Sequence, residues 1–330
     1  MSRTVAFFNN KGGVGKTTLA YHTAWMLREL GVSVLAVDLD PQANMTSAFI
    51  DDEAVEQLWT GVTRRTIYGT VAPLFEGVGG VAPPYVHEVV PGLALVPGDL
   101  ALSSTEQDLA TAWPNAGDGN KRAFQVLASF ATAAHDAAAS CGADLVLLDV
   151  GPNLGAINRA AMVASDHVVV PLSPDVYSLQ GLRNLGPTLR TWRSEWADRR
   201  DKADDVPVPQ GRMAPVGYIV LQRGVRLDRV VGAYDRWLRR VPGEYRRALL
   251  AEEPVDPPPA SDDPHCLGLM KHYHGLVPMA QEARRPLFLL RSADGAIGAH
   301  QQAVLAAYAH FRELALRILD AIGMSALASR

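Results

Sequence analysis

Residues 9–18 read N-N-K-G-G-V-G-K-T-T, and the rest of the chain can be interpreted outward from them. An apolar run at residues 5–8 precedes this stretch, and a segment with helical spacing of apolar residues, 19–30, follows it. A strand, a glycine-rich turn and a helix in this order are typical of a phosphate-binding loop. Glycines let the backbone curl and point N–H groups at an anion, and the helix adds the positive end of its dipole. The residues expected to bind the phosphate groups of a nucleotide are Gly12, Gly13, Val14, Gly15, Lys16, Thr17 and Thr18.

Two side chains of this stretch have predicted roles. Lys16 can reach the β- and γ-phosphates of a nucleotide, and the Thr17 hydroxyl is a suitable ligand for Mg²⁺. The stretch departs from the general pattern G-x-x-x-x-G-K-[ST], because Asn10 stands at its first glycine and is followed by Lys11. A glycine-rich turn of chance composition is the alternative explanation, but a complete G-K-T between a strand and a helix disfavours it.

The form K-G-G-x-G-K-T-T resembles the deviant Walker A box of the ParA/MinD family of ATPases, and Lys11 is the residue that defines the resemblance. The resemblance implies that Lys11 reaches across a dimer interface to the nucleotide of the other subunit, and that ATP and Mg²⁺ are the cofactors. A lysine from a partner subunit would stabilise the negative charge that spreads over a γ-phosphate during transfer. Lys11 and Lys16 are therefore both expected to act in catalysis.

Acidic residues end two later apolar strands. The first strand, at residues 32–37, runs into D-L-D-P-Q-A-N at 38–44, and the second, L-V-L-L-D, ends at Asp149. The carboxyl ends of parallel strands are where α/β folds bind ligands. The second strand has the Walker B pattern, in which the Asp149 carboxylate holds the water shell of Mg²⁺. The family resemblance implies that Asp40 orients the attacking water and that Asp38 supports the metal shell.

The composition fits one large α/β domain. The chain has 330 residues, 48% of them hydrophobic, and only two cysteines, too few for a disulfide framework. We expect the N-terminus to lead directly into a strand without a signal peptide, and no run approaches the roughly 20 apolar residues of a membrane helix. We expect a single P-loop NTPase domain over residues 1–330, with a mostly parallel sheet and helices on both faces, in the cytoplasm and without stable membrane insertion.

Further elements follow from the apolar pattern and the turn residues. Residues 51–92 are expected to be less regular, and residues 114–120 are expected to form a loop. Apolar residues on one face of the last helix are expected to pack in the core. Strands are predicted at residues 92–98, 167–171 and 216–221, and helices at 101–113, 122–139 and 299–322.

Two segments are expected near the nucleotide base. In the family an Asn often follows the strand at 216–221 and contacts adenine, whereas Gln222 stands there in this chain. The resemblance also implies that the loop Pro278–Glu282 flanks the base. After the Walker B strand the family commonly has two prolines, whereas this chain has Gly151 and Pro152, which predicts a more flexible loop.

Residues 241–264 interrupt the resemblance. They hold six prolines and several acidic residues. A segment of this composition is not expected to bury enough apolar surface to order itself. We interpret it as a surface insertion and not as a domain boundary.

A basic segment lies inside a chain whose net charge is −4. From Arg183 to Arg247 there are 15 Lys and Arg against 8 Asp and Glu, a local charge of +7. Such a segment indicates a polyanion site, although a solvated helix face explains either of its two arginine runs equally well. The resemblance favours DNA, because family members bind DNA without sequence preference through basic residues of this half. The candidate DNA-binding residues are Arg190, Arg193, Arg223, Arg226 and Arg229.

Together these patterns predict an ATPase that switches between a monomer and an ATP-bound homodimer. The resemblance implies that the dimer binds nonspecific DNA on the nucleoid and is released by a ParB-like or cargo-adaptor protein that stimulates hydrolysis. The cargo would be a plasmid, a chromosome or a protein assembly. Two alternatives stay open: a MinD-like ATPase that cycles on and off a membrane, and an ATP-dependent regulatory or defence protein of the same fold.

Overall fold

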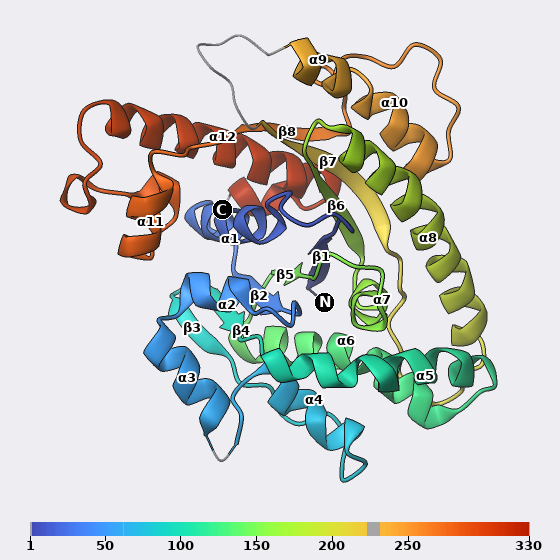
Figure 1. The fold of residues 1–330 in the computed structure, drawn as a ribbon. Coiled ribbons are helices and arrows are strands. Elements are labelled where there is room, and N and C mark those ends of the chain that lie inside the picture. Colours follow the sequence, from blue (N-terminus) through green and yellow to red (C-terminus); the bar gives the residue numbers. More distant parts are fainter. Residues whose placement is uncertain (1, 62, 223–231, 330) are drawn as a thin grey trace.

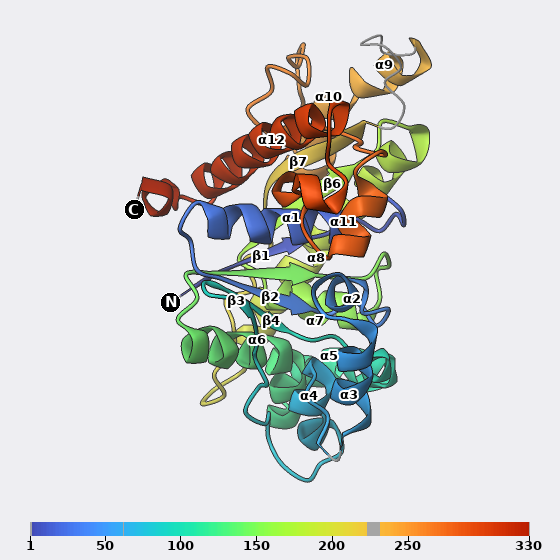
Figure 2. The same ribbon diagram turned by 90° about the vertical axis from the view of Figure 1, so that its left-hand side faces the viewer.

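The computed structural model describes residues 2–61, 63–222 and 232–329. Eight strands of this part form one sheet in the order β3-β4-β2-β5-β1-β6-β7-β8 (Figures 1 and 2). Neighbouring strands are parallel except β3 and β4, which are antiparallel. The strands are β1 (Arg3–Phe7), β2 (Val34–Asp38), β3 (His87–Val90), β4 (Leu93–Val96), β5 (Leu145–Asp149), β6 (His167–Leu172), β7 (Ala214–Gln222) and β8 (Cys266–Lys271).

Helices lie on both faces of the sheet, which confirms the predicted fold class (Figure 2). The α-helices are α1 (Lys16–Glu29), α2 (Asn44–Phe49), α3 (Asp52–Thr60), α4 (Ile67–Phe75), α5 (Glu106–Gly117), α6 (Lys121–Cys141), α7 (Ala156–Val163), α8 (Val176–Arg200), α9 (Gly232–Leu238), α10 (Val241–Tyr245), α11 (Val277–Ala283) and α12 (Ala299–Ala321). Shorter 3₁₀ segments are η1 (Leu100–Thr105), η3 (Leu287–Leu289), η4 (Ser292–Asp294) and η5 (Ser325–Ser329), and η2 (Arg246–Leu250) is a π-helical turn.

The central strands are apolar because both of their faces are covered. All five residues of β2 and of β5 are buried. The side chains of α4 to α8 pack on one face of the sheet, and those of α1 and α12 pack on the other. Phe311, Leu314 and Ile318 of α12 are at most 4% exposed, which confirms that the last helix packs in the core. Among the described residues, no helix combines the length and the apolar character that crossing a membrane requires.

The sheet order explains why distant parts of the sequence meet. β5 lies between β1 and β2, and the register aligns Phe7 with Asp149 and Asp149 with Asp38. Because the three strands are parallel, the segments that follow them leave the sheet at the same edge. The phosphate loop and the two acidic strand ends are therefore neighbours. Figure 2 shows α2 and α11 at the edge toward which these strands point.

The expectation of little regular structure at residues 51–92 is wrong, because α3 and α4 form there. Asp51 caps α3 by accepting a hydrogen bond from the Ala54 N–H at 2.8 Å, and Thr66 caps α4 through the Gly69 N–H at 3.2 Å. Capping residues of this kind satisfy N–H groups that a helix start leaves unpaired. The two helices then bury Val55, Leu58, Ile67, Val71 and Leu74.

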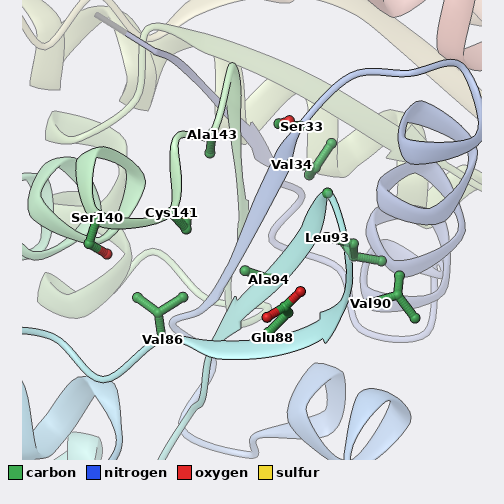
Figure 3. Close-up of a pocket in the computed structure, with 11 residues that line it drawn as sticks. Ser33, Val34, Val86, Glu88, Val90, Leu93, Ala94, Ser140, Cys141 and Ala143 are labelled. Atoms are coloured by element: carbon green, nitrogen blue, oxygen red, sulfur yellow. The ribbon is translucent and has the colours of Figure 1, made fainter.

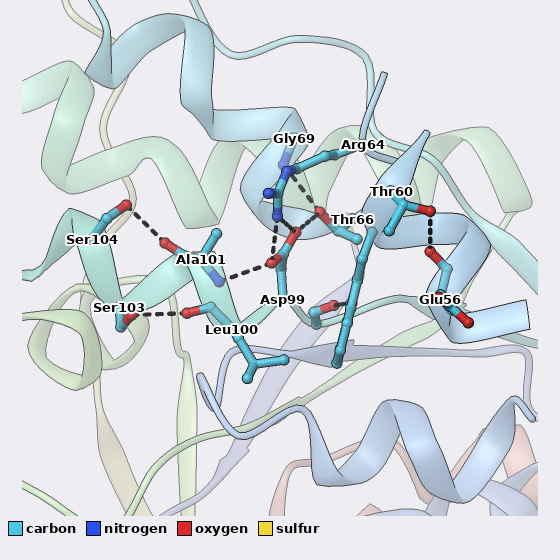
Figure 4. A network of polar contacts seen from close by, with 12 residues as sticks. Glu56, Thr60, Arg64, Thr66, Gly69, Asp99, Leu100, Ala101, Ser103 and Ser104 are labelled. Atoms are coloured by element: carbon cyan, nitrogen blue, oxygen red, sulfur yellow. Dashed lines mark hydrogen bonds and ion pairs between the residues drawn. The ribbon is translucent and has the colours of Figure 1, made fainter. Parts of the chain in front are cut away.

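A polar network around Asp99 fixes this region to the end of β4 (Figure 4). Asp99 is 1% exposed, and its carboxylate accepts from the Arg64 guanidinium at 3.0 Å and the Thr66 hydroxyl at 2.9 Å. The Trp59 ring nitrogen donates to the Gly98 carbonyl at 3.0 Å. The bonds from Arg64 and Thr66 satisfy a carboxylate that would be costly to bury alone.

The expected loop at residues 114–120 is also corrected, because α5 continues to Gly117 and only three residues separate it from α6. Pro114 lies inside the last turn of α5, where its missing N–H removes one hydrogen bond. Trp113 and Ala116 are 5% and 0% exposed. Burial of these side chains against the neighbouring helices outweighs the unfavourable helix propensity of Pro114 and Gly117.

The expectation that residues 241–264 do not order themselves is wrong as well. Tyr245 of α10 is fully buried, and its ring centroid lies 5.1 Å from that of Tyr218 on β7. Arg246 donates two hydrogen bonds to the Asp263 carboxylate, at 2.6 and 2.9 Å, and the Tyr218 hydroxyl donates a third at 2.7 Å. The composition did not reveal that arginine and tyrosine partners would satisfy this buried acid.

His22 joins α1 to the segment that follows α11. Its Nδ1 lies 2.7 Å from the Thr18 carbonyl and its Nε2 accepts a hydrogen bond from the Leu287 N–H at 3.2 Å. These partners require the neutral ring with the proton on Nδ1. Burial lowers the pKa of His22 to about 4 from 6.5, although the Thr18 carbonyl opposes this shift. Protonation of the His22 Nε2 atom would place its new N–H against the Leu287 N–H, so the hydrogen bond between them would be lost.

We expect His22 to make the fold sensitive to acid. The unfolded chain binds a proton at His22 below pH 6.5, whereas the folded chain binds one only near pH 4. The contribution of the neutral ring to the free energy of unfolding is therefore complete above pH 6.5 and is lost as the pH falls from 6.5 to about 4. Between pH 7 and pH 4, the free energy of unfolding of the wild type should fall by about 3 kcal/mol more than that of His22→Gln. Urea unfolding at both pH values measures this, with His135→Gln, at an exposed histidine, as the control. Parallel losses in wild type and His22→Gln would contradict the neutral buried ring.

Candidate functional site

Residues 8–15 connect β1 to α1 in a turn whose backbone favours glycine at two positions. Gly13 and Gly15 have φ values of 71° and 74°, in the left-handed region. A Cβ at Gly15 would also lie 2.4 Å from Leu221 Cδ1, so an alanine would collide with the end of β7. Gly12 and Gly13 are exposed, whereas Val14 is fully buried and anchors the loop.

Asn9 holds the loop to β6, and Asn10 lies beside α8. Asn9 is fully buried, donates to the Pro171 carbonyl at 2.7 Å, and accepts from the Lys11 N–H at 3.0 Å. The Asn10 Oδ1 atom lies 3.1 Å from the position that a Cβ at Gly181 of α8 would occupy. The departure from the general loop pattern at Asn10 therefore places an amide against α8.

Lys16 is buried at the start of α1. It is 7% exposed, and its Nζ lies 3.4 Å from the Lys11 carbonyl. Burial lowers the pKa of Lys16, while the negative charges of Asp149 and Asp40 act to raise it. A cation held here between the phosphate loop and two carboxylates is placed to bind a phosphate group.

Asp38 is the most fully hydrogen-bonded acid of the site. It is fully buried, and its Oδ2 accepts from the Thr46 N–H at 2.8 Å and the Thr46 hydroxyl at 2.7 Å. Thr46 in turn accepts from the Gly98 N–H at 2.7 Å. Burial raises the pKa of Asp38, and the Thr46 bonds oppose that shift. Because Thr46 occupies one of its oxygens, Asp38 is better suited to shaping the site than to binding a metal ion directly.

Asp149 differs from Asp38, because its buried carboxylate has fewer hydrogen-bond partners in the described structure. It is fully buried, and within the described residues neither oxygen makes a hydrogen bond of normal geometry, although the Thr17 hydroxyl lies close enough to lower its pKa. Burial and the nearby charge of Asp38 raise the pKa of Asp149 well above its usual range. Asp40, 6% exposed, uses its Oδ1 to accept from the Gln42 N–H at 3.0 Å.

The donor set of this edge fits Mg²⁺. Asp38, Asp40 and Asp149 bring three carboxyl groups together, and Lys16 is the cation beside them in the described part of the chain. A buried carboxylate without hydrogen-bond donors needs a positive partner. Mg²⁺ prefers oxygen ligands and retains water molecules, which suits the Thr17 hydroxyl and the Asp149 carboxylate.

The sequence analysis missed the residue that orders the loop after β5. Glu106, at the start of α5, accepts from the Ala156 N–H at 2.5 Å and the Ile157 N–H at 3.0 Å. It thereby caps α7 from a different helix. A Cβ at Gly155 would lie 2.6 Å from Glu106 Oε1, so this glycine is required for the contact. No local pattern links residue 106 to residue 156, so only the fold reveals the cap.

Lys11 extends from the loop to α8. Its Nζ lies 2.5 Å from Asp175 Oδ2 and 3.4 Å from Ser178 Oγ, and 5.7 Å from the centre of the Tyr177 ring. Asp175 also caps α8 by accepting from the Ser178 N–H at 2.8 Å. In the single chain Lys11 is therefore paired within its own subunit.

The two predicted base-side residues lie on elements of the same edge. Gln222 is the last residue of β7, directly after Leu221, which abuts Gly15. The expected loop Pro278–Glu282 is instead helical, because it lies within α11; Pro278 is exposed in the first turn, where a helix tolerates proline. The Gln222 side chain is outside the described structure, so its contact with adenine stays a prediction.

The candidate DNA-binding arginines fall into two groups. Arg190 donates to the Ala248 carbonyl and Arg193 donates to the Met213 carbonyl at 3.0 Å, and both are half-buried. These bonds fix α8 to its neighbours and leave fewer donors for phosphate groups. The other candidates, Arg223, Arg226 and Arg229, lie outside the described residues.

A cavity of about 360 Å³ lies away from this edge (Figure 3). Ser33 and Val34 border it where β2 begins, Leu93 where β4 begins, and Cys141 at the end of α6. The amino ends of parallel strands are opposite to the phosphate loop, so this cavity is not the nucleotide site.

Comparison with known proteins agrees with the geometry of the site. A family model described as the AAA domain matches residues 2–200, which is more than half of the chain and includes the phosphate loop and the Asp149 strand. The chromosome-partitioning ATPase Soj of Thermus thermophilus is 35% identical over 193 residues. The chain belongs to the ParA/MinD family. The part of this ParA/MinD-family chain that aligns with Soj is 58% of its own length and 63% of Soj, so it spans less than two thirds of that relative.

Solved structures extend the likeness in fold to the C-terminal part of this ParA/MinD-family chain. Protein DIP2308 from Corynebacterium diphtheriae superposes with a TM-score of 0.71 at 23% identity, covering 97% of this chain and 98% of that one. A Cyanothece McdA–ATP complex gives a TM-score of 0.62 at 14% identity, covering 98% and 97%. At these identities the likeness shows a shared fold.

Proposed function

We propose that the chain binds ATP with Mg²⁺, hydrolyses it, and uses ATP to switch from a monomer to a homodimer. The observation that carries this proposal is the convergence of Lys16, Asp40 and Asp149 beside a loop with two left-handed glycines. The Thermus relative is named as an ATPase, and the Cyanothece fold neighbour is an ATP complex. Residues 1–330 are proposed to form one domain around the single sheet, with residues 241–264 as an insertion.

In this proposal the chain's own groups bind and orient the substrate. The backbone N–H groups of the phosphate loop and the Lys16 ammonium hold the phosphate oxygens, and Asp40 orients the water that attacks. Mg²⁺, held by the Thr17 hydroxyl and through water by Asp149, supplies positive charge to the phosphate oxygens when it is bound. Asp38, fixed by Thr46, keeps the acidic edge in place.

A second copy of the chain is proposed to pack on the face that carries Lys11. Val176 and Tyr177 at the start of α8 are 47% and 74% exposed, and Leu154, in the loop after β5, is 36% exposed. Apolar side chains exposed around a ligand site mark a surface for association. On this face Lys11 is proposed to leave Asp175 and to reach the nucleotide of the second subunit, where it stabilises the charge of the transferring phosphate.

Lys11→Ala should lower ATP turnover by at least about tenfold while ATP affinity changes less than about threefold. The reason is that the proposed target of Lys11 lies in the other subunit. Asp175→Asn is the matched variant, because asparagine keeps the cap of α8 and removes the ion pair with Lys11. Since exposed ion pairs contribute up to about 1 kcal/mol, ATP-dependent dimerisation should strengthen by up to about fivefold.

Nucleotide titration, phosphate release and sedimentation of the two variants measure these effects. If Lys11→Ala lost binding and turnover equally, Lys11 would act within its own subunit.

Nonspecific DNA is the proposed matrix for the dimer. Three arginines, Arg183, Arg240 and Arg247, pair with the carboxylate of Glu244, which is 6% exposed, and two more, Arg236 and Arg239, lie in or directly after α9. Arg183 pairs with Glu244 at 2.7 Å, and Arg236 and Arg240 lie 4.8 and 5.1 Å from the centre of the Trp237 ring. We call these residues the Glu244 arginine cluster: Arg183, Arg236, Arg239, Arg240 and Arg247.

The charge of this cluster supports the proposal. Within the described residues, four of the five arginines pair with two acids, Asp235 and Glu244. The side chains of these four arginines are 46–75% exposed and so are accessible to phosphates, which position DNA without reading its sequence. When dimerisation brings two such surfaces together, both bind one DNA duplex, and the overall affinity is higher than that of either surface alone.

DNA affinity should therefore require ATP, fall steeply with added salt, and depend little on sequence. Replacing Arg239, Arg240 and Arg247 with alanine should reduce the slope of log affinity against log salt by up to about 3 and keep ATP-dependent dimerisation. Fluorescence anisotropy on random duplex with ATP, ADP or no nucleotide measures this, with exposed Arg312→Ala of α12 as the control. The same titration applies to Arg223, Arg226 and Arg229.

Equal DNA affinity in all three nucleotide states, or no binding at low salt, would remove DNA as the matrix. The membrane alternative is disfavoured for the last helix, because Phe311, Leu314 and Ile318 pack in the core. The regulatory or defence alternative is distinguished by the neighbouring gene: a ParB-like or adaptor gene beside this one would support cargo positioning on the nucleoid.

A further inference from the structure

Asn158 of α7 lies beneath the loop that follows β5. It is 1% exposed, and its Nδ2 donates to the Gly151 carbonyl at 2.9 Å, the Asn153 carbonyl at 2.8 Å and Asn153 Oδ1 at 3.0 Å. Three oxygen acceptors around one atom identify that atom as the amide nitrogen. The other terminal atom of Asn158 is therefore the oxygen.

This oxygen is buried and unpaired. Within residues 2–61, 63–222 and 232–329, Asn158 Oδ1 has no hydrogen-bond donor. Buried polar atoms are nearly always satisfied by protein groups or by an ordered water, because an unpaired acceptor destabilises the fold. Among the donors of the described residues none reaches Asn158 Oδ1, and an ordered water is the kind of group that would satisfy it.

Gly151 shows where that donor fits. A Cβ at this glycine would lie 3.5 Å from Asp40 Oδ1, and 3.6 and 3.7 Å from the Nδ2 and Oδ1 atoms of Asn158, so both acceptors border the space that its missing side chain leaves. Gly151 is buried, and its φ is not in the left-handed region. The glycine is thus not required by the backbone, and its effect is to keep this space open.

We propose that Asn158 Oδ1 and the Asp40 carboxylate hold one water molecule beside Gly151, and that this water hydrolyses ATP. The inference rests on the proposed function and adds Asn158 as a second positioning residue. The water donates one hydrogen bond to each acceptor, and its lone pair stays free for the γ-phosphorus. The new oxygen–phosphorus bond forms as the bond from the γ-phosphorus to the bridging oxygen breaks. ADP leaves, and the second water proton passes along the Asp40 hydrogen bond to the released phosphate.

Gly151→Ala tests the water position without touching either acceptor. The added methyl group makes no contact shorter than 3.5 Å, so the fold and the Asn158 hydrogen bonds should stay unchanged. It occupies the space of the water, however, and turnover should fall by at least about tenfold. The KM for ATP, the ATP-dependent dimerisation and the melting temperature should match those of the wild type.

Asn153→Ala is the control for a purely structural role of Asn158. It removes an oxygen that accepts from Asn158 and from the Gly155 N–H, and so loosens the same loop without filling the space. Its turnover should stay within about twofold of the wild type. Wild-type turnover in Gly151→Ala, or equal losses in both variants, would overturn the water site and leave the proposed ATPase intact. A wild-type chain that binds ATP without turning it over would overturn both.

Discussion

Lys16→Ala should abolish detectable ATP turnover and weaken ATP binding by about 10- to 100-fold. Lys16 is the buried cation of the phosphate loop, and charge-assisted hydrogen bonds to phosphate contribute about 1.5–3 kcal/mol each. Its loss also leaves Asp40 and Asp149 without the positive charge beside them, which further disfavours an anionic ligand. Isothermal titration with ATP and a phosphate-release assay measure the two effects.

Lys121→Ala is the matched control, because this lysine is 64% exposed at the start of α6. It should bind and hydrolyse ATP as the wild type does. Turnover at the wild-type rate in Lys16→Ala would show that the nucleotide site is elsewhere.

Asp40→Ala should trap the ATP-bound dimer, with turnover lowered by at least about 100-fold. The substitution removes the carboxylate proposed to orient the water and leaves Lys16 and Thr17 to bind phosphate and Mg²⁺. Asp40 also accepts a hydrogen bond from the Gln42 N–H, so Asp40→Asn, which preserves an acceptor there, separates loss of charge from loss of the turn. Gel filtration with ATP reads the dimer in both variants.

A variant that stays monomeric with ATP, under conditions where the wild type dimerises, would contradict the switch role of Asp40. The Asp40 and Gly151 variants should differ in one respect. Both slow hydrolysis, but only the Asp40 substitutions change the charge next to Lys16.

Much of the fold and the nucleotide edge could be predicted because the signals are local. The glycines of the phosphate loop stand next to the strand and helix that they join, and Asp149 ends a strand whose five residues are all buried. The carboxyl ends of parallel strands share one edge of the sheet, so Asp38 and Asp149 were expected at that edge, whereas their direct pairing depends on the strand order that the structure shows.

The remaining features depend on contacts between distant segments. Glu106 caps α7 across 50 residues of sequence, and Asp263 is satisfied by Arg246 and Tyr218. The pairing of Lys11 with Asp175 spans 164 residues. Propensity and composition describe a residue and its neighbours, so they misjudged Pro114 in α5 and the proline-rich residues 241–264, where tertiary burial decides the structure.

Sedimentation velocity of the wild type with ATP and Mg²⁺, with ADP and Mg²⁺, and without nucleotide tests the central claim most directly. Single-chain mass is 35.5 kDa, and the account predicts twice that mass with ATP and the single-chain mass in the other two states. A slowly hydrolysed ATP analogue should hold the dimer for the length of the run. The same mass in all three states, at protein concentrations where ATP is bound, would contradict an ATP-driven dimerisation switch.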